Sequence, residues 1–335
     1  MIRALAPGRV NLIGDHTDHT GGLVLPMAID LATTVSGHRG KEVVTLRSPA
    51  EPEPAVVPID VSDPAAVTPG WARYVAGVVA ELRPEAGFSG EVSSSLPIGA
   101  GLSSSAALEV AVALALGFEG PPLALAQLAQ RAEQRASGVP CGIMDQLASA
   151  AGVEGHALRI DCSSLEVSPV VLPGDVEVVV VDSGQRRELA TSAYAERAAA
   201  CQAAQAELGP LPSATLGDVA GLRDPLMRRR ARHVVTENAR VDELVAALAV
   251  GDRAAMGEVM AASHASLRDD FEVSTPVVDA LVARLRGVDG VIGVRLTGAG
   301  FGGCVVTLVE RGAPAPPDVV AWRVRASAGA HVEEI

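Results

Sequence analysis

The chain has 335 residues, of which 48% are hydrophobic and 20% charged, so it is long enough for two domains and too apolar to be intrinsically disordered. Its formal net charge of -13 argues against non-specific binding to nucleic acid or to an anionic membrane surface. Lys41 is the only lysine. A phosphate-binding site must therefore depend on backbone N–H groups, a helix N-terminus, a metal ion or arginine.

The four cysteines form no CxxC pair, which disfavours a zinc site or a disulfide framework. Free thiols in a reducing compartment are the simpler interpretation. The N-terminal segment lacks the long apolar run of a signal peptide, and no apolar stretch reaches the roughly 18 residues that a membrane helix needs. We therefore expect a cytoplasmic protein with no membrane attachment.

In the first half of the chain, apolar runs bounded by turn residues predict short strands at residues 10–13, 23–29, 43–46 and 90–95. Longer runs rich in alanine and leucine predict helices at residues 71–82, 103–116, 123–136 and 146–151. The proline-rich segment at residues 48–70 is expected to form loops.

In the second half, a mainly apolar run at residues 176–181 predicts a central strand. Predicted helices follow at residues 192–208, 227–248, 253–267 and 276–286, with a connector at 210–225. Two further strands, at residues 291–296 and 304–309, flank a glycine-rich loop at 298–303. Without a regular βαβ repeat this order predicts an α+β fold, with domains at residues 1–172 and 173–335.

The most informative segment is the Gly/Ser-rich loop at residues 96–107, where a glycine turn and three serines lead into an apolar helix. The first turn of a helix leaves N–H groups unpaired, and these attract phosphate together with the helix dipole. The loop lacks the lysine of a Walker sequence and the third glycine of a Rossmann fingerprint. A capped buried helix is the alternative, but the density of Gly and Ser favours an anion site. The predicted phosphate-binding residues are Gly99, Ala100, Gly101, Leu102, Ser103, Ser104 and Ser105.

A second segment, residues 6–22, packs Arg9, Asp15, His16, Asp18 and His19 into a short stretch between two apolar runs. Carboxylates accept hydrogen bonds from sugar hydroxyls, and arginine stabilises phosphoryl oxygens. A solvated hairpin turn is the alternative. A metal site is disfavoured because hard and soft ligands are mixed.

Two acidic residues are further candidates. Asp145 precedes a helix of small residues, where it is either a helix N-cap or a general base or positioning group for a hydroxyl. Glu133 lies on the preceding predicted helix, as a surface carboxylate or a metal ligand. The glycine-rich loop at residues 298–303 suits close approach to a ligand, although a flexible β connection has the same composition.

Taken in order, these segments resemble the GHMP family of small-molecule kinases, and within it the galactokinases. The matching motifs are GRVNLIGDHTD at residues 8–18, LPIGAGLSSSAALEVA at 96–111, CGIMDQ at 141–146, SAYAERAAAC at 192–201, SHASLRDDFEVS at 263–274 and TGAGFGGC at 297–304. The resemblance implies a two-domain GHMP kinase fold with the active site in the interdomain cleft. It also implies transfer of the ATP γ-phosphoryl group to the C1 hydroxyl of galactose, giving galactose 1-phosphate and ADP.

By this resemblance Asp145 is the catalytic base and Arg9 stabilises the transition state. The Gly/Ser-rich loop wraps the phosphates, and Ser105 and Glu133 ligate Mg²⁺. The residues that hold the sugar are Asp15, His16, Thr17, Asp18, Gly142 and Tyr194. The implied partners are a small sugar and ATP, without nucleic acid or membrane, and we expect a monomer or weak homo-oligomer.

The sugar-facing turn departs from the usual family sequence, GEHTDYNGG, because Asp15, His19 and Thr20 replace Glu, Tyr and Asn. The phosphate-binding and catalytic motifs are intact, so the reaction class is better determined than the sugar. One alternative is a kinase for a related sugar, such as an amino sugar, arabinose or a uronic acid. The other is a non-catalytic sugar-sensing regulator, against which the retained catalytic and metal-binding residues argue.

Overall fold

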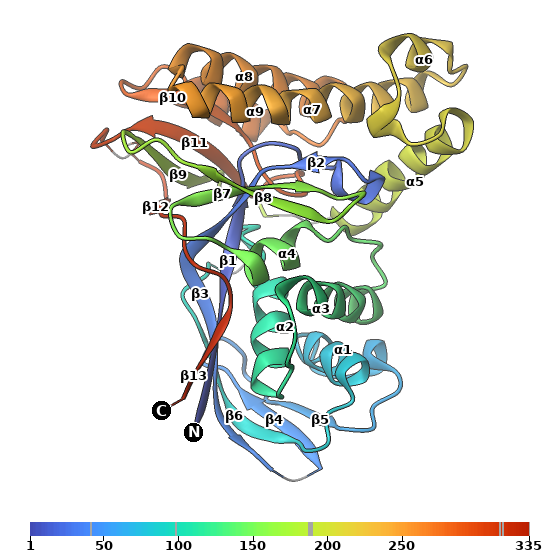
Figure 1. Ribbon diagram of the computed structural model, residues 1–335, viewed down its shortest axis with the longest axis vertical. Coiled ribbons are helices and arrows are strands. Elements are labelled where there is room, and N and C mark those ends of the chain that lie inside the picture. The colour runs from blue at the N-terminus through green and yellow to red at the C-terminus, as the bar shows by residue number, and fades with distance from the viewer. Residues whose placement is uncertain (41, 98, 187–189, 315, 317, 335) are drawn as a thin grey trace.

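Figure 1 shows a computed structural model of the chain, which describes residues 1–40, 42–97, 99–186, 190–314, 316 and 318–334. Two predicted features fall partly outside this range: the single lysine, Lys41, and Ile98 of the Gly/Ser-rich loop. The described chain builds two lobes of mixed helix and strand, which confirms the predicted α+β class (Figure 1).

The first lobe is a six-stranded sheet with helices on one face (Figure 1). Its strands, in the order β13-β1-β3-β6-β4-β5, are β13 (His331–Glu334), β1 (Ile2–Asn11), β3 (Pro26–Arg39), β6 (Phe88–Ser94), β4 (Val43–Arg47) and β5 (Ala55–Pro58). The covering helices are α1 (Ala72–Leu82), α2 (Ser104–Ala115), α3 (Pro122–Ser137) and α4 (Met144–Ala151). Helix α2 is almost wholly buried because its alanines and valines pack against both the sheet and the neighbouring helices.

The second lobe is built on a four-stranded sheet in the order β10-β11-β9-β12. These strands are β10 (Val291–Leu296), β11 (Cys304–Glu310), β9 (Val176–Asp182) and β12 (Ala321–Val324). The helices of this lobe are α5 (Ala190–Leu208), α6 (Leu216–Gly221), α7 (Pro225–Val250), α8 (Arg253–Asp269) and α9 (Pro276–Leu285). Strand β9 lies between two neighbours, as predicted for a central strand.

The apolar run of β9 is continuous because both of its faces are buried. Val178 and Val180 join the larger hydrophobic core, which extends through the first lobe, while Val179 and Val181 point into the core beneath the helices of the second lobe. Successive side chains of a strand alternate between faces, so the segment that separates two cores, residues 178–181, is apolar at every position.

A small sheet and three short 3-10 helices complete the fold. The sheet joins β2 (Leu23–Val24), β7 (His156–Asp161) and β8 (Glu166–Val171), and the 3-10 helices are η1 (Asp18–Thr20), η2 (Pro64–Ala66) and η3 (Leu211–Ser213). In the described part of the chain, no helix is long and apolar enough to cross a membrane.

Several element predictions need correction. The proline-rich segment contains β5 and η2, and the connector contains η3 and α6, where Thr215 and Asp218 form a capping box. The predicted strand at residues 23–29 is divided between β2 and β3. Strand β13 was not foreseen, and it returns from the second half of the chain to pair with β1 (Figure 1). Residues 331–334 therefore lie on the sheet of the first lobe.

Candidate active site

Two adjoining cavities lie between the lobes. The smaller, of about 220 Å³, is walled by the turn after β1, the start of α4, Tyr194 of α5, and the glycine-rich loop. The larger, of about 600 Å³, is walled by the Gly/Ser-rich loop and by residues 182 and 184–186 after β9. Arg9, Glu133, Asp145 and Ala299 border both cavities, so a group bound in one can react with a group bound in the other.

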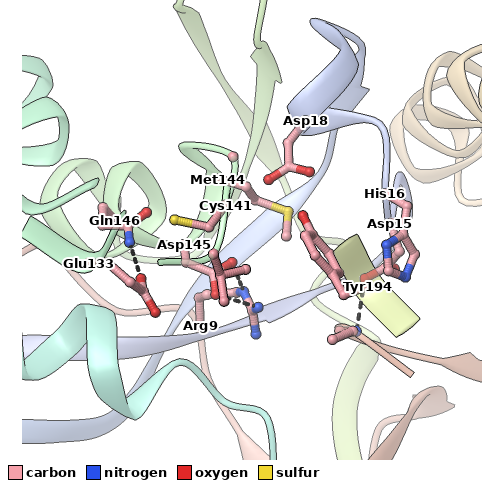
Figure 2. A pocket seen from close by; sticks show the side chains of 14 residues that line it. Arg9, Asp15, His16, Asp18, Glu133, Cys141, Met144, Asp145, Gln146 and Tyr194 are labelled. Carbon is pink, nitrogen blue, oxygen red and sulfur yellow. Dashed lines mark hydrogen bonds and ion pairs between the residues drawn. The ribbon is translucent and has the colours of Figure 1, made fainter. Parts of the chain in front are cut away.

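An arginine–carboxylate pair stands where the cavities meet. Arg9 Nε and Nη2 each donate to one oxygen of Asp145 at 2.7 Å, and Ser103 Oγ donates to Asp145 Oδ2 at 2.5 Å. The Arg9 side chain is 6% exposed, whereas that of Asp145 is 30% exposed, so the carboxylate is held in place yet remains open to the cavities. Figure 2 shows this pair at the centre of the site. A fixed carboxylate of this kind can orient a hydroxyl group or accept its proton.

The Gly/Ser-rich loop faces the larger cavity. Six of its seven predicted residues line that cavity, and Leu102 instead buries its side chain in the core. Gly99, Gly101 and Ser103 have positive φ values of 76°, 79° and 59°, which turn the chain sharply into α2. Ser103 is the N-cap residue but caps no N–H group, because its hydroxyl is bonded to Asp145. The first N–H groups of α2 therefore remain available for phosphate.

Gly8 explains how the loop comes so close to β1. A side chain at Gly8 would place its Cβ 2.6 Å from Leu102 O and 2.4 Å from Leu96 Cδ2. The backbone contact that glycine permits is a hydrogen bond of 3.2 Å from Arg9 N to Leu102 O. The glycine thus sets the separation between Arg9 and the phosphate-binding loop.

Glu133 and Ser105 form the candidate magnesium site. Ser105 Oγ donates to Glu133 Oε1 at 3.0 Å. Gln146 Nε2 donates to Glu133 Oε2 at 2.5 Å (Figure 2). Burial, with the nearby charge of Asp145, raises the pKa of Glu133 to about 7. A carboxylate and a hydroxyl are hard oxygen ligands that suit Mg²⁺. Glu133 accepts its hydrogen bonds from the neutral side chains of Ser105 and Gln146, so its negative charge favours binding of a cation. The residues present therefore fit the metal.

Glu109 is a second buried carboxylate near this site, and sequence analysis did not single it out. It lies on α2, and burial together with the charge of Glu133 raises its pKa well above the ordinary value. It is fully buried, so the neutral acid is favoured over the charged form.

Besides Glu133, the smaller cavity is lined by a carboxylate, Asp18, to which the described residues donate no hydrogen bond from a cationic side chain. Burial, and then repulsion from Asp145, raise the pKa of Asp18 to about 7. The carboxylate lies against Gly142, where an added Cβ would come within 1.9 Å of Asp18 Oδ2. Figure 2 shows Asp18 reaching into the cavity opposite Arg9. Such a group is suited to accept hydrogen bonds from hydroxyl groups of a ligand.

Two aromatic side chains complete the wall. His16 has a positive φ of 65° and packs on Phe271, with ring centroids 4.6 Å apart, and on Tyr194, with centroids 5.6 Å apart. Thr17, by contrast, is not among the described residues that line either cavity. Its hydroxyl lies 2.8 Å from Gly14 O and 2.6 Å from Leu23 O, so it braces the turn from within.

Several residues that belong to the site were missed by sequence reasoning. Gln146 lies within the quoted CGIMDQ motif, and its contact with Glu133 could not be read from sequence. Arg295 lies two residues before the TGAGFGGC motif and forms an ion pair with Asp15. Arg186 borders the larger cavity and adds the positive charge that a chain with one lysine must supply from arginine. An isolated arginine in an unremarkable segment carries no sequence signal of this role.

The fold and the site together define the chain as a GHMP kinase. Residues 73–153 match the GHMP kinases N terminal domain, and residues 244–323 match the GHMP kinases C terminal family. Residues 2–39 match the Galactokinase galactose-binding signature. The Methanococcus jannaschii mevalonate kinase structure shares the fold, with a TM-score of 0.71 and 21% identity over 98% of each chain.

The galactokinases are the more similar relatives. Human galactokinase is 45% identical over 327 residues, which cover 92% of this chain and 83% of the human protein. Bovine galactokinase is 46% identical over 329 residues, with the same shares covered. The structure of Lactococcus lactis galactokinase complexed with galactose superposes with a TM-score of 0.89, at 29% identity over 98% of this chain and 95% of that one. This chain belongs to the galactokinase family, whose kinases use ATP as co-substrate.

Proposed function

We propose that the protein transfers the γ-phosphoryl group of ATP to the C1 hydroxyl of galactose, giving galactose 1-phosphate and ADP. The observation that carries the proposal is the junction of two cavities at the Arg9–Asp145 pair. A sugar in the smaller cavity and the phosphates of ATP in the larger one would meet at this junction. Phosphoryl transfer depends mainly on such positioning and on stabilisation of charge.

Each group at the junction has a role in this scheme. Asp145 orients the attacking hydroxyl or removes its proton. Arg9 stabilises the negative charge on the phosphoryl group in the transition state of the transfer. Ser103 and Arg9 keep the Asp145 carboxylate in one orientation through three hydrogen bonds. The backbone of the Gly/Ser-rich loop would bind the ATP phosphates, and Ser105 and Glu133 would hold Mg²⁺. The bound metal supplies positive charge to the phosphate oxygens.

The sugar would be held by the turn after β1 and by the facing residues Gly142 and Tyr194. Asp18 is the principal acceptor for sugar hydroxyls in this scheme, with His16 and Tyr194 forming an aromatic wall. Thr17 supports the turn from within, and Asp15 contributes at the edge of the cavity.

Two of the three departures from the usual family turn, His19 and Thr20, weigh little against galactose. Among the described residues, His19 and Thr20 do not line the smaller cavity. Thr20 Oγ1 donates to Thr17 O at 2.7 Å inside the turn, and the ring of His19 meets Tyr194 edge-on with centroids 5.9 Å apart. Both changes therefore lie behind the sugar-facing surface, which supports galactose over an amino sugar, arabinose or a uronic acid.

A panel of sugars tests the substrate. ADP release from the purified chain with ATP and Mg²⁺ should be greatest with galactose, and phosphorus NMR should place the new phosphate on C1. If another sugar is phosphorylated and galactose is not, the proposed kinase reaction stands but galactose is not the substrate. No turnover of any sugar would favour a sugar-sensing regulator.

Replacement of the carboxylate tests the mechanism. Asp145→Asn and Asp145→Ala should lower kcat by about 1,000-fold or more while leaving ATP binding within a few-fold of wild type. Asp242→Ala, which removes an exposed carboxylate paired with Arg159 on the surface, should leave turnover unchanged. If the Asp145 variants keep the wild-type kcat, the proposed role of Asp145 as base or positioning group is refuted.

We also propose that the enzyme acts in the cytoplasm as a monomer or weak homo-oligomer. Cys141, Cys162 and Cys201 are thiols, which supports a reducing compartment. Exposed large hydrophobic side chains, such as Val56, Val171 and Val250, are scattered along the chain. Scattered apolar residues of this kind are ordinary for a monomer surface.

A further inference from the structure

The second lobe holds a buried arginine that serves no part of the mechanism described above. Arg295 is the last residue but one of β10, and its side chain is 0% exposed. An arginine without solvent costs several kcal/mol unless its charge and N–H groups are matched by partners. The identity of those partners therefore indicates why the arginine is there.

The partners lie at the end of β1 and in the turn that follows it. Arg295 Nη1 donates to Leu12 O at 2.9 Å, and Nη2 forms an ion pair with Asp15 Oδ2. The other carboxylate oxygen, Asp15 Oδ1, accepts the backbone N–H of Gly298 at 2.8 Å. Both oxygens of Asp15 are thus engaged by the second lobe. The arginine, the carboxylate and the glycine-rich loop form one connected unit across the cleft.

Helix α7 supports this unit from behind. Glu237 Oε1 lies 3.7 Å from Arg295 Nη2 and accepts the backbone N–H of Gly14 at 3.1 Å. His233 Nε2 lies 3.0 Å from Asp15 O. Because burial lowers the pKa of His233, the ring is neutral, and Nε2 must carry its hydrogen to donate to that carbonyl. The turn that begins at Gly14 is therefore held by α7 as well as by β10.

We propose that Arg295 is a positioning residue for the sugar: through Asp15 it holds the turn at residues 14–18 against the glycine-rich loop at 298–303, and so assembles the sugar-binding half of the cleft. The inference rests on the proposed function for the identity of the ligand. Asp15 acts in this arrangement as the link between lobes, while Asp18 remains the acceptor for sugar hydroxyls. Asp15, Asp18 and Gly298 all line the smaller cavity, so a shift of the turn or the loop changes its shape. Among the described residues, the partners of Arg295 lie outside the Gly/Ser-rich loop.

The kinetic test compares three variants with a control. Arg295→Met, Arg295→Lys and Asp15→Asn should each raise the KM for the sugar by about tenfold or more, because a shift of about 1 Å in a binding group has effects of this size. The KM for ATP should stay within about twofold. Thr307→Val is the matched control: it removes a buried hydrogen bond to Val179 O in the same sheet and should change neither KM. Equal rises in both KM values, or an unchanged KM for the sugar, would overturn the proposal.

A double-mutant cycle and amide hydrogen exchange separate this inference from the proposed function. Asp15→Asn combined with Arg295→Met should raise the KM hardly more than either change alone, since both break one link. Hydrogen exchange needs no substrate: residues 14–18 and 298–303 should exchange at least about tenfold faster in Arg295→Lys, with no change in Thr307→Val. Retained protection of both segments would reject the inference even if galactose is the substrate. Lost protection would support it even if another sugar is.

Discussion

Replacing Gly142 by alanine should weaken sugar binding by displacing Asp18. An ideal Cβ at Gly142 would lie 1.9 Å from Asp18 Oδ2 and 2.2 Å from Asp18 Cγ. Non-bonded heavy atoms settle at about 3.5 Å, so the carboxylate must retreat by roughly 1.5 Å. A misplacement of about 1 Å in a binding group can cost about 100-fold, and we expect the KM for galactose to rise by that factor.

The same geometry predicts that the variant folds. The obstructing atoms all belong to Asp18: its carboxylate can rotate away, but Asp18 Cβ, 2.8 Å from the added Cβ, requires a small backbone shift, so the cost in stability should be about 1–3 kcal/mol. The KM for ATP should be unchanged, because Gly142 does not border the larger cavity among the described residues. Steady-state kinetics with each substrate varied in turn, together with thermal melting, measure these quantities.

Gly221→Ala is the control for the alanine substitution itself. Gly221 is the last residue of helix α6 in the second lobe. Apart from its chain neighbours and its own helix, no described atom lies within 4 Å of an added Cβ at Gly221. That variant should keep both KM values and gain slightly in stability. If the KM of Gly142→Ala for galactose stays within twofold of the wild-type value, the proposed contact between Asp18 and the sugar is refuted. If that variant loses ATP affinity as well, the division of the cleft into two halves is wrong.

Three further predictions concern single polar groups. Galactose should bind more tightly as the pH rises through about 7, the pKa of buried Asp18, because the charged carboxylate is the better acceptor; calorimetry on wild type and Asp18→Asn measures this. Ser103→Ala should lower kcat about tenfold with both KM values unchanged, because it removes only the 2.5 Å bond to Asp145 and no helix cap. Glu109→Gln should stabilise the protein relative to wild type increasingly as the pH rises above about 5, measured by urea unfolding at several pH values.

The sign of the Glu109 effect follows from linkage. The folded state keeps the proton of Glu109 after the unfolded chain has released it near the ordinary pKa of 4.5, so the free energy of unfolding falls as the pH rises above that value. Glutamine cannot lose a proton and escapes this loss. A constant difference between wild type and Glu109→Gln from pH 5 to pH 8 would contradict a raised pKa. A flat pH profile of galactose binding, or a Ser103→Ala variant with full kcat, would contradict the other two assignments.

The local parts of the site could be predicted from sequence because each is built from consecutive residues. The turn through Gly99 and Gly101 into α2 depends on φ values that glycine adopts freely, so residues 96–107 predict a phosphate site on their own. The apolar run of β9 likewise identifies a strand buried on both faces. These features follow from backbone preference and hydrophobicity, which act over a few residues.

Contacts between distant segments could not be predicted in the same way. Arg9 and Asp145 are 136 positions apart, and Asp15 and Arg295 are 280 apart. The pairing of β13 with β1 joins the two ends of the chain, and no local pattern in residues 331–334 specifies that partner. Such contacts depend on how whole helices and strands pack together. They require a loss of chain entropy, which only the burial of the assembled core offsets.

The sequence by itself determined the Gly/Ser-rich loop as a candidate phosphate site, Asp145 as a candidate catalytic carboxylate, and the order of most helices and strands. Only the tertiary structure decided that Thr17 supports the turn from within, that both oxygens of Asp15 are held by the second lobe, and that His19 and Thr20 lie behind the sugar cavity. The physical reason is that the type of a residue determines which hydrogen bonds and ion pairs its side chain can form. The folded structure determines which partners lie within reach of that side chain and how far it is exposed to water.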